Sequence, residues 1–132
     1  MRRYAREVAF CKVYEYLMSK TVDIDLSMFE VDKLTEEDVS YINGLYNYTC
    51  DNITELLAKI ETLVIGYKIE RVYKIDLSVL LLAIAELKST DTPKEIIINE
   101  AVDIAKKFST DKSVTFVNGV LAEYVRGVVA NV

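Results

Sequence analysis

The sequence predicts an all-α protein of six to seven helices in one domain. Apolar residues recur at spacings of three and four along most of the chain, which is the period of one helix face. One proline and four glycines among 132 residues leave few turn signals for a many-stranded sandwich or barrel. Hydrophobic residues make up 52%, well above the content of disordered chains. The length suits one domain, so we expect residues 1–132 to form a single domain.

The first helix is expected over residues 3–19, where apolar residues such as Ala5, Val8 and Val13 follow the helical period. Residues 20–34 carry many acidic side chains. This composition predicts a linker, with one short helical turn around Leu26 to Phe29.

A second helical stretch starts after Thr35. This residue resembles an N-cap, because three acidic residues follow it and suit the dipole of a first turn. The stretch extends to about Val64 with a break near Asp51, and Asp51 or Asn52 could cap its second half. Gly66 is expected to end it.

The most apolar helix is predicted over residues 76–88, with Asp76 as its N-cap. It is apolar nearly all round, which is typical of the buried centre of a bundle. The clearest helix start follows. Thr92 as the cap, Pro93 at the first helical position and Glu95 three residues after the cap predict a capping box.

The last two helices are separated by a polar break at residues 109–111. The first of them carries an apolar stripe that ends at Phe108, and the second carries one from Val114 to Val128. Gly119 lies inside the last helix, where glycine costs about 1 kcal/mol relative to alanine. A close helix–helix approach at Gly119 could offset that cost.

Charge is spread unevenly along the chain. The net charge of -5 excludes a wholly basic nucleic-acid binder. A local basic patch is still compatible with it, because surface charges are screened beyond about 8 Å at physiological salt. Arg2, Arg3 and Arg6 form such a patch at the start of the chain, whereas residues 23–38 are strongly acidic.

Several kinds of chemistry lack candidate residues. Histidine is absent, which removes the commonest general base and the commonest zinc ligand. Cys11 and Cys50 form no disulfide framework and predict reduced thiols in a cytoplasmic protein. The apolar run from Leu77 to Ala85 is far shorter than the ~20 residues of a membrane span. We predict no catalytic residue, no metal and no cofactor, while an enzyme built on carboxylates, lysine or tyrosine stays open in principle.

The three arginines occupy one side of the predicted first helix. Arg2, Arg3 and Arg6 fall within about 100° of each other on a helical wheel and are expected to point outward. Positive charge at a helix N-terminus opposes the macrodipole, so the fold itself gives no reason for it. The residues alone leave two interpretations open, a solvated helix end or a contact for an anionic ligand.

Three segments of the chain resemble the NusB family, in the family's order and at its spacing. The opening R-R-Y-A-R-E at residues 2–7 is similar to the family's arginine-rich helix. Residues 71–87 match its arginine, then its aspartate, then an apolar helix that ends in E-L. Residues 93–121 contain the most specific pieces, I-N-E-A at 98–101 and F-V-N-G-V-L at 116–121.

The resemblance implies two packed helical bundles and a bacterial transcription antitermination factor. Family members bind the boxA element of ribosomal RNA leader transcripts together with the ribosomal small-subunit protein NusE, and the complex lets RNA polymerase read through terminators. An arginine, an aromatic residue, a glycine and an aspartate are usual where this chain has Leu81, Ala85, Ser109 and Ala122. Leu81 and Ala85 are compatible with a core, so they affect the expected surface contacts more than the fold.

By this resemblance Arg2, Arg3 and Arg6 are RNA contacts. Arginine suits the task because its planar fork bonds phosphate in two places and stacks on bases. Lys112 and Phe116 at the start of the last helix are further candidates. They could bind and stack on a single-stranded base, or they could be a solvated lysine and a core aromatic residue.

Tyr14 and Asp76 are weaker candidates for the protein-partner surface, with core-edge and N-cap roles as their alternatives. Asn99 and Asn118 could face RNA. We expect them instead to cap or cross-link helices, because buried amides need hydrogen-bond partners.

The leading hypothesis is a non-catalytic RNA-binding adaptor that acts with NusE in the transcription elongation complex. The second is a protein-interaction module of the same fold without RNA binding of its own, as that fold also occurs as an extension on RNA cytosine methyltransferases. The third is an enzyme with clustered carboxylates, which the placement of these residues at helix starts and on solvated faces disfavours. A monomer and a homodimer are both compatible with the sequence.

Overall fold

The structure, a computed structural model, describes residues 2–64, 66 and 68–130, apart from the side chains of residues 2 and 128–130. This part of the chain contains helices and connecting segments and no strand, which confirms the predicted all-α fold. The elements are α1 (Arg2–Ser19), η1 (Val31–Lys33), α2 (Glu36–Asp51), α3 (Ile53–Leu63), η2 (Ile69–Arg71), α4 (Lys74–Ser89), α5 (Lys94–Phe108) and α6 (Asp111–Ala130).

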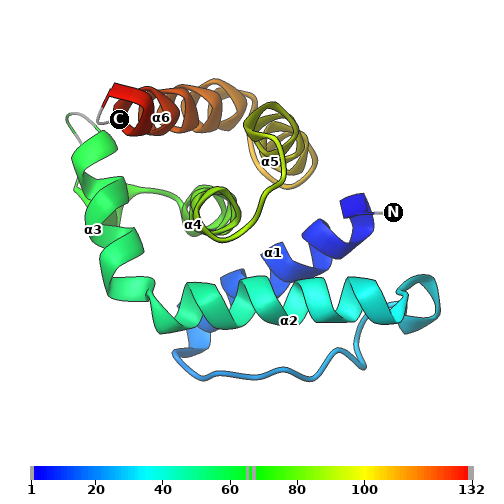
Figure 1. The fold of residues 1–132 in the computed structure, drawn as a ribbon. Helices are drawn as coiled ribbons and strands as arrows, with labels where there is room; N and C mark the ends of the chain where they lie inside the picture. Colours follow the sequence, from blue (N-terminus) through cyan, green and yellow to red (C-terminus); the bar gives the residue numbers. More distant parts are fainter. Residues whose placement is uncertain (1, 65, 67, 131–132) are drawn as a thin grey trace.

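Helix α4 is the centre of the molecule, as its composition predicted. Every residue from Asp76 to Glu86 is buried, because each of the other five α-helices packs against α4. Figure 1 shows α4 nearly end-on. Helices α1 and α2 lie on one side of α4 and helices α5 and α6 on the opposite side, while α3 flanks α4 between these two pairs. The two helical bundles therefore share one helix. Leu81 and Ala85 are fully buried in it, in agreement with their core-compatible character.

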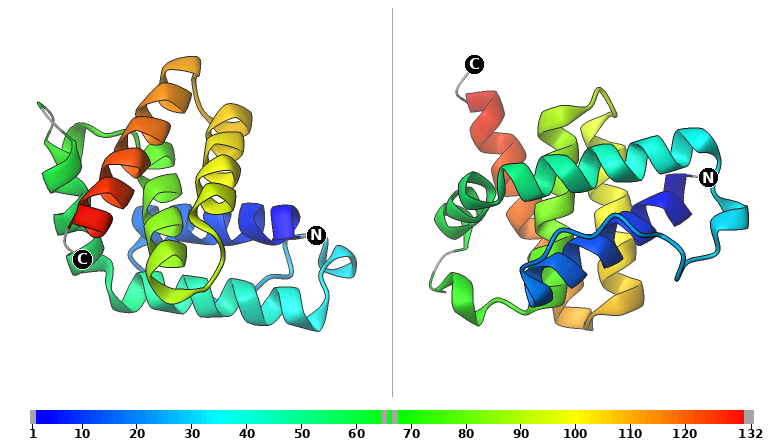
Figure 2. Two further views of the ribbon diagram at one scale, coloured as in Figure 1. Left: turned by 45° about the horizontal axis from the view of Figure 1, so that its top comes forward. Right: turned by 90° about the horizontal axis from the view of Figure 1, so that it is seen from below.

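Helices α1 and α2 run in the same direction, so the segment between them must return along the length of a helix (Figures 1 and 2). The predicted turn is present, because the amide of Phe29 donates to the carbonyl of Leu26 at 3.0 Å. Three side chains of α1 and α2 hold the return segment in place. The Lys12 ammonium donates to the Asp25 carbonyl (3.0 Å), and the phenol oxygens of Tyr46 and Tyr4 accept from the amides of Asp23 (3.0 Å) and Glu30 (2.9 Å).

The buried phenol of Tyr46 makes the stability of this anchoring dependent on pH. Burial raises the pKa of Tyr46 to about 12, although the hydrogen bond from Asp23 opposes the rise. The phenol of the unfolded chain titrates near 10. The native state therefore holds this proton more tightly, and the resulting stability is fully present below about pH 10 and is lost as the pH rises toward about 12.

We expect the urea midpoint of the Tyr46→Phe variant to fall less steeply between about pH 10 and pH 12 than that of the unmodified protein. Tyr73→Phe is the matched control, since Tyr73 is 64% exposed. An equally steep fall in both the unmodified protein and the Tyr46→Phe variant would contradict this assignment.

The helix boundaries of the first half largely match the prediction. Thr35 caps α2 in a full capping box, with its hydroxyl accepting from the Asp38 amide and the Asp38 carboxylate accepting from the Thr35 amide. The break near Asp51 is confirmed, and Asn52 occupies the N-cap position of α3. Its side chain makes no capping bond, because its Nδ2 atom donates back to the Tyr48 carbonyl at 2.8 Å. Helix α3 ends at Leu63, and Gly66 beyond it has a φ of 82°, which favours glycine.

The caps of the second half differ from the prediction. Helix α4 begins at Lys74, so Asp76 lies inside its first turn and is not the N-cap. Helix α5 begins at Lys94 with Pro93 at the capping position and no side-chain cap, so the predicted capping box from Thr92 is wrong. A hydroxyl does cap α6, because the Thr110 oxygen accepts from the amide of Ser113 at 3.1 Å.

Three interpretations of polar or small residues are also corrected. A Cβ atom added at Gly119 would meet nothing within 4 Å, so no close helix approach occurs there. Asn99 and Asn118 are exposed, so burial gives neither amide a reason to cross-link helices.

Cys11 and Cys50 are free thiols, as predicted, and burial raises the pKa of both. Among the described helices, none has the length and apolarity to cross a bilayer.

Candidate functional site

Arg6 is a buried residue, and the expectation that it points outward is wrong. Only 5% of it is exposed. Its Nε and Nη2 atoms donate to the two carboxylate oxygens of Glu86 at 3.1 and 2.8 Å. Its Nη1 atom lies 3.6 Å from Glu100, and its Cζ atom lies 5.7 Å from the ring centroid of Tyr41. Burial opposes the charged form, but the bonds and charge of Glu86 outweigh it and raise the pKa of Arg6.

The sequence contained a signal for this pair. Glu86 is an acidic residue near the end of a helix that is otherwise apolar nearly all round. A carboxylate in such a position needs a buried cation with matching geometry. Arg6 follows Ala5, a fully buried residue of α1, and α1 packs directly on α4. The arginine therefore joins two helices, which a helical wheel of α1 alone does not reveal.

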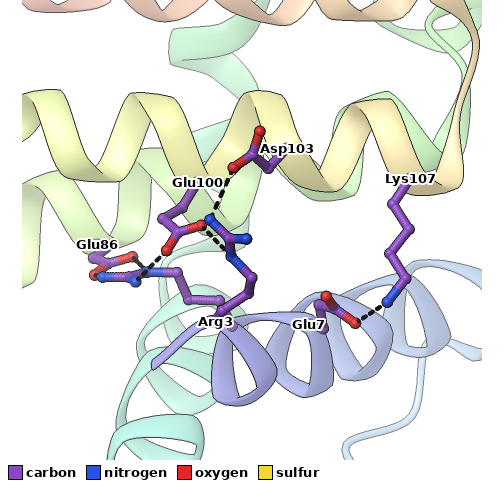
Figure 3. Close-up of polar contacts among 7 residues, drawn as sticks. Arg3, Glu7, Glu86, Glu100, Asp103 and Lys107 are labelled. Atoms are coloured by element: carbon purple, nitrogen blue, oxygen red, sulfur yellow. Dashed lines mark hydrogen bonds and ion pairs between the residues drawn. The ribbon is translucent and has the colours of Figure 1, made fainter. Parts of the chain in front are cut away.

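Arg3 has the exposed position that was predicted for it, with 65% of its side chain accessible. Its guanidinium is nevertheless engaged by α5 (Figure 3). Nε donates to Glu100 at 3.2 Å, and Nη2 donates to Asp103 at 3.1 Å. The side chain of Arg2, the remaining predicted arginine, lies outside the described residues.

A small cavity of about 210 Å³ lies between α1 and α5 at this point. One turn further along α1, Glu7 accepts from the Lys107 ammonium at 2.8 Å, as Figure 3 shows. The charged side chains of the cavity wall balance, with three cations and three carboxylates. The lining consists of Arg3, Arg6, Glu7, Glu100, Asp103, Ile104 and Lys107.

A larger groove of about 540 Å³ lies at the start of α6. Lys112 is exposed on its wall, whereas Phe116 packs partly against the hydrophobic core and also lines the groove. Both interpretations of Phe116 therefore apply to different parts of one ring. Arg71 and Tyr73, which sequence reasoning did not select, are exposed in the same groove. Its lining consists of Arg71, Val72, Tyr73, Asp76, Thr110, Asp111, Lys112, Ser113 and Phe116.

Asp76 forms the buried floor of this groove. It is 4% exposed, and its two carboxylate oxygens accept from the hydroxyls of Ser109 at 2.6 Å and Ser113 at 2.8 Å. Ser109 stands where the family pattern expects glycine, so this departure supplies a hydroxyl. The network fixes the first turn of α6 against the first turn of α4 and so holds Lys112 and Phe116 in position.

The C-terminal half of α5 connects the cavity to the groove. Asp103 and Lys107 contact α1 as described, and the rings of Phe10 and Phe108 lie 5.2 Å apart. Ser109 then reaches the floor of the groove. Tyr14 is half-buried further along α1 and belongs to the lining of neither feature. The cavity with Arg3 and the groove with the α6 residues thus lie at the two ends of the C-terminal half of α5 and share no lining residue.

The fold is thus a small all-helical one in which two bundles share the central helix α4, with the cavity and the groove on its surface. The family model described as "NusB family" matches residues 3–126. The chain belongs to the NusB family.

Curated relatives carry the same name. The "Transcription antitermination protein NusB" of Ruminiclostridium cellulolyticum is 40% identical over 129 residues, which is 96% of this chain and 89% of the relative. The solved structure of T. maritima NusB matches with a TM-score of 0.84 at 24% identity, over 93% of this chain and 89% of that one. A structure of NusB and NusE in complex with dsRNA matches with a TM-score of 0.83 at 24% identity, over 96% of both chains.

Proposed function

We propose that this protein is a non-catalytic RNA-binding adaptor of bacterial transcription antitermination. It binds a boxA-type leader RNA together with ribosomal protein NusE and supports read-through by RNA polymerase within the cytoplasmic elongation complex. Membership of the NusB family and the relatives named for antitermination support this role.

The observation that carries the proposal is the pair of features at the two ends of the C-terminal half of α5. The cavity at the start of α1 offers Arg3, and the groove at the start of α6 offers Lys112 and the accessible part of Phe116. Single-stranded RNA is recognised by cations on its phosphates and aromatic rings on its bases. Both kinds of group are present in these two features. By the family resemblance Arg2 is a further candidate for phosphate binding, and Arg71 and Tyr73 are further candidates in the groove.

Arg6 and Asp76 have indirect roles in this proposal. The Arg6 guanidinium is hydrogen-bonded to Glu86. In this proposal Arg6 therefore positions α1 against α4, and Arg2 and Arg3 bind phosphate. Each carboxylate oxygen of Asp76 accepts from one serine hydroxyl, so Asp76 shapes the surface that a protein partner would contact. Tyr14 remains the candidate on α1 for contact with NusE.

The test is the RNA affinity of the protein with and without NusE, measured by fluorescence anisotropy with a labelled boxA-type RNA and a scrambled RNA of equal composition. We expect about tenfold tighter binding of the boxA-type RNA, which corresponds to one base contact of about 1–3 kcal/mol, and further tightening with NusE. Binding of NusE without any preference for the boxA-type RNA would instead identify a protein-interaction module.

A further inference from the structure

Two carboxylates of α5 occupy the binding edge of Arg3. Its Nε atom lies 3.2 Å from Glu100 Oε2, and its Nη2 atom lies 3.1 Å from Asp103 Oδ2. Arginine binds phosphate bidentately through two parallel N–H groups, and Nε and Nη2 form one such pair. The two carboxylate oxygens therefore stand where two oxygens of one phosphate would stand (Figure 3).

The charge around Arg3 adds to this competition. The cavity wall is balanced, and Glu86 behind it adds one more carboxylate through its bond to Arg6. Among the side chains that the structure describes, the local cluster thus contains three cations and four carboxylates. An RNA phosphate that approaches Arg3 therefore meets the repulsion of these carboxylates as well as the attraction of the cations.

The two carboxylates differ in how readily they can be released. Glu100 is 18% exposed and its second oxygen faces the buried Arg6. Asp103 is 43% exposed and contacts Arg3 alone among the ion pairs of the described residues. Exposed pairs of this kind are weak, so one phosphate oxygen can replace Asp103 at Nη2, whereas Glu100 keeps its bond to Nε.

We propose that Asp103 competes with RNA phosphate for Arg3 and so sets the affinity of this end of the site. This inference rests on the proposed function and deepens it. Because the competition lowers the phosphate affinity of the free protein, RNA is retained only when contacts in the groove or on NusE add to those of α1.

The test compares Asp103→Asn with the unmodified protein, using boxA-type and scrambled RNA at low salt. The asparagine keeps the shape of the side chain and removes its charge. We expect about fivefold tighter binding of both RNAs, since one unit charge a few ångströms from a phosphate in water has an effect of this order. Glu55→Gln is the matched control, because Glu55 is an exposed carboxylate on α3, and its effect should stay below about twofold. Unchanged or weaker RNA binding by Asp103→Asn would overturn the proposal and identify Asp103 as a residue that orients Arg3.

A second readout separates this proposal from the proposed function. The Nε–H resonance of Arg3, assigned with Arg3→Lys, is followed by NMR during titration with inorganic tripolyphosphate. A lower half-saturation concentration in Asp103→Asn supports the competition even if no RNA binds, in which case only the proposed function fails. Equal half-saturation concentrations in the two proteins would reject the competition whether or not RNA binds.

Discussion

Replacing Arg6 by alanine is expected to lower the free energy of unfolding by about 3–5 kcal/mol, because it leaves the carboxylate of Glu86 buried without its cation. The pair is nearly inaccessible, with 6% and 2% of the two side chains exposed. Urea denaturation followed by circular dichroism measures this loss. It is the largest effect on stability that we expect from any single charged residue of α1.

Two further variants make the stability prediction specific. Arg3→Ala should change the free energy of unfolding by less than about 1 kcal/mol, because its ion pairs are exposed. The double variant Arg6→Met, Glu86→Leu should recover most of the stability that Arg6→Ala loses, since an apolar pair of similar volume removes the unpaired charge. A loss below about 1 kcal/mol for Arg6→Ala would show that Glu86 finds another partner or water.

Replacing Arg2 and Arg3 together by glutamine is expected to weaken binding of the boxA-type RNA about tenfold, or ~0.7 kcal/mol for each lost arginine. Stability should be unchanged, because Arg3 is an exposed side chain. Lys59→Gln with Arg126→Gln is the matched control. It removes two exposed positive charges from α3 and the far end of α6 (Figure 1) and should leave RNA affinity within about twofold.

The contrast between Arg3 and Arg6 shows how far the sequence alone could lead. Helical periodicity placed the outer helices, because burial of an amphipathic face determines it, whereas α4 was placed by its nearly continuous apolar residues. The arginines were treated as one group because their angles on a helical wheel are similar. Their different environments arise from α5 and α4, which present Asp103 to one and Glu86 to the other. Only the packing of helices distant in sequence separates an exposed arginine from a buried one.

The helix ends and the groove illustrate the same limit. Thr35 was predictable because its capping partner, Asp38, is local. Asp76 was not, because its partners are hydroxyls of Ser109 and Ser113, more than thirty residues away. No local pattern marks Tyr73. Arg71 opens the second family-like segment, but both residues join Lys112 and Phe116 only because the segment before α4 and the start of α6 line one groove.

The salt dependence of RNA affinity tests the RNA-binding role of the α1 arginines most directly. Each phosphate contact to single-stranded nucleic acid contributes about -0.7 to the slope of log K against log salt concentration. The slope for the boxA-type RNA should therefore be shallower by about 1.4 in the Arg2→Gln, Arg3→Gln variant than in the unmodified protein. Equal slopes in the two proteins would mean that these arginines bind no phosphate, and would contradict an RNA path that begins at the start of α1.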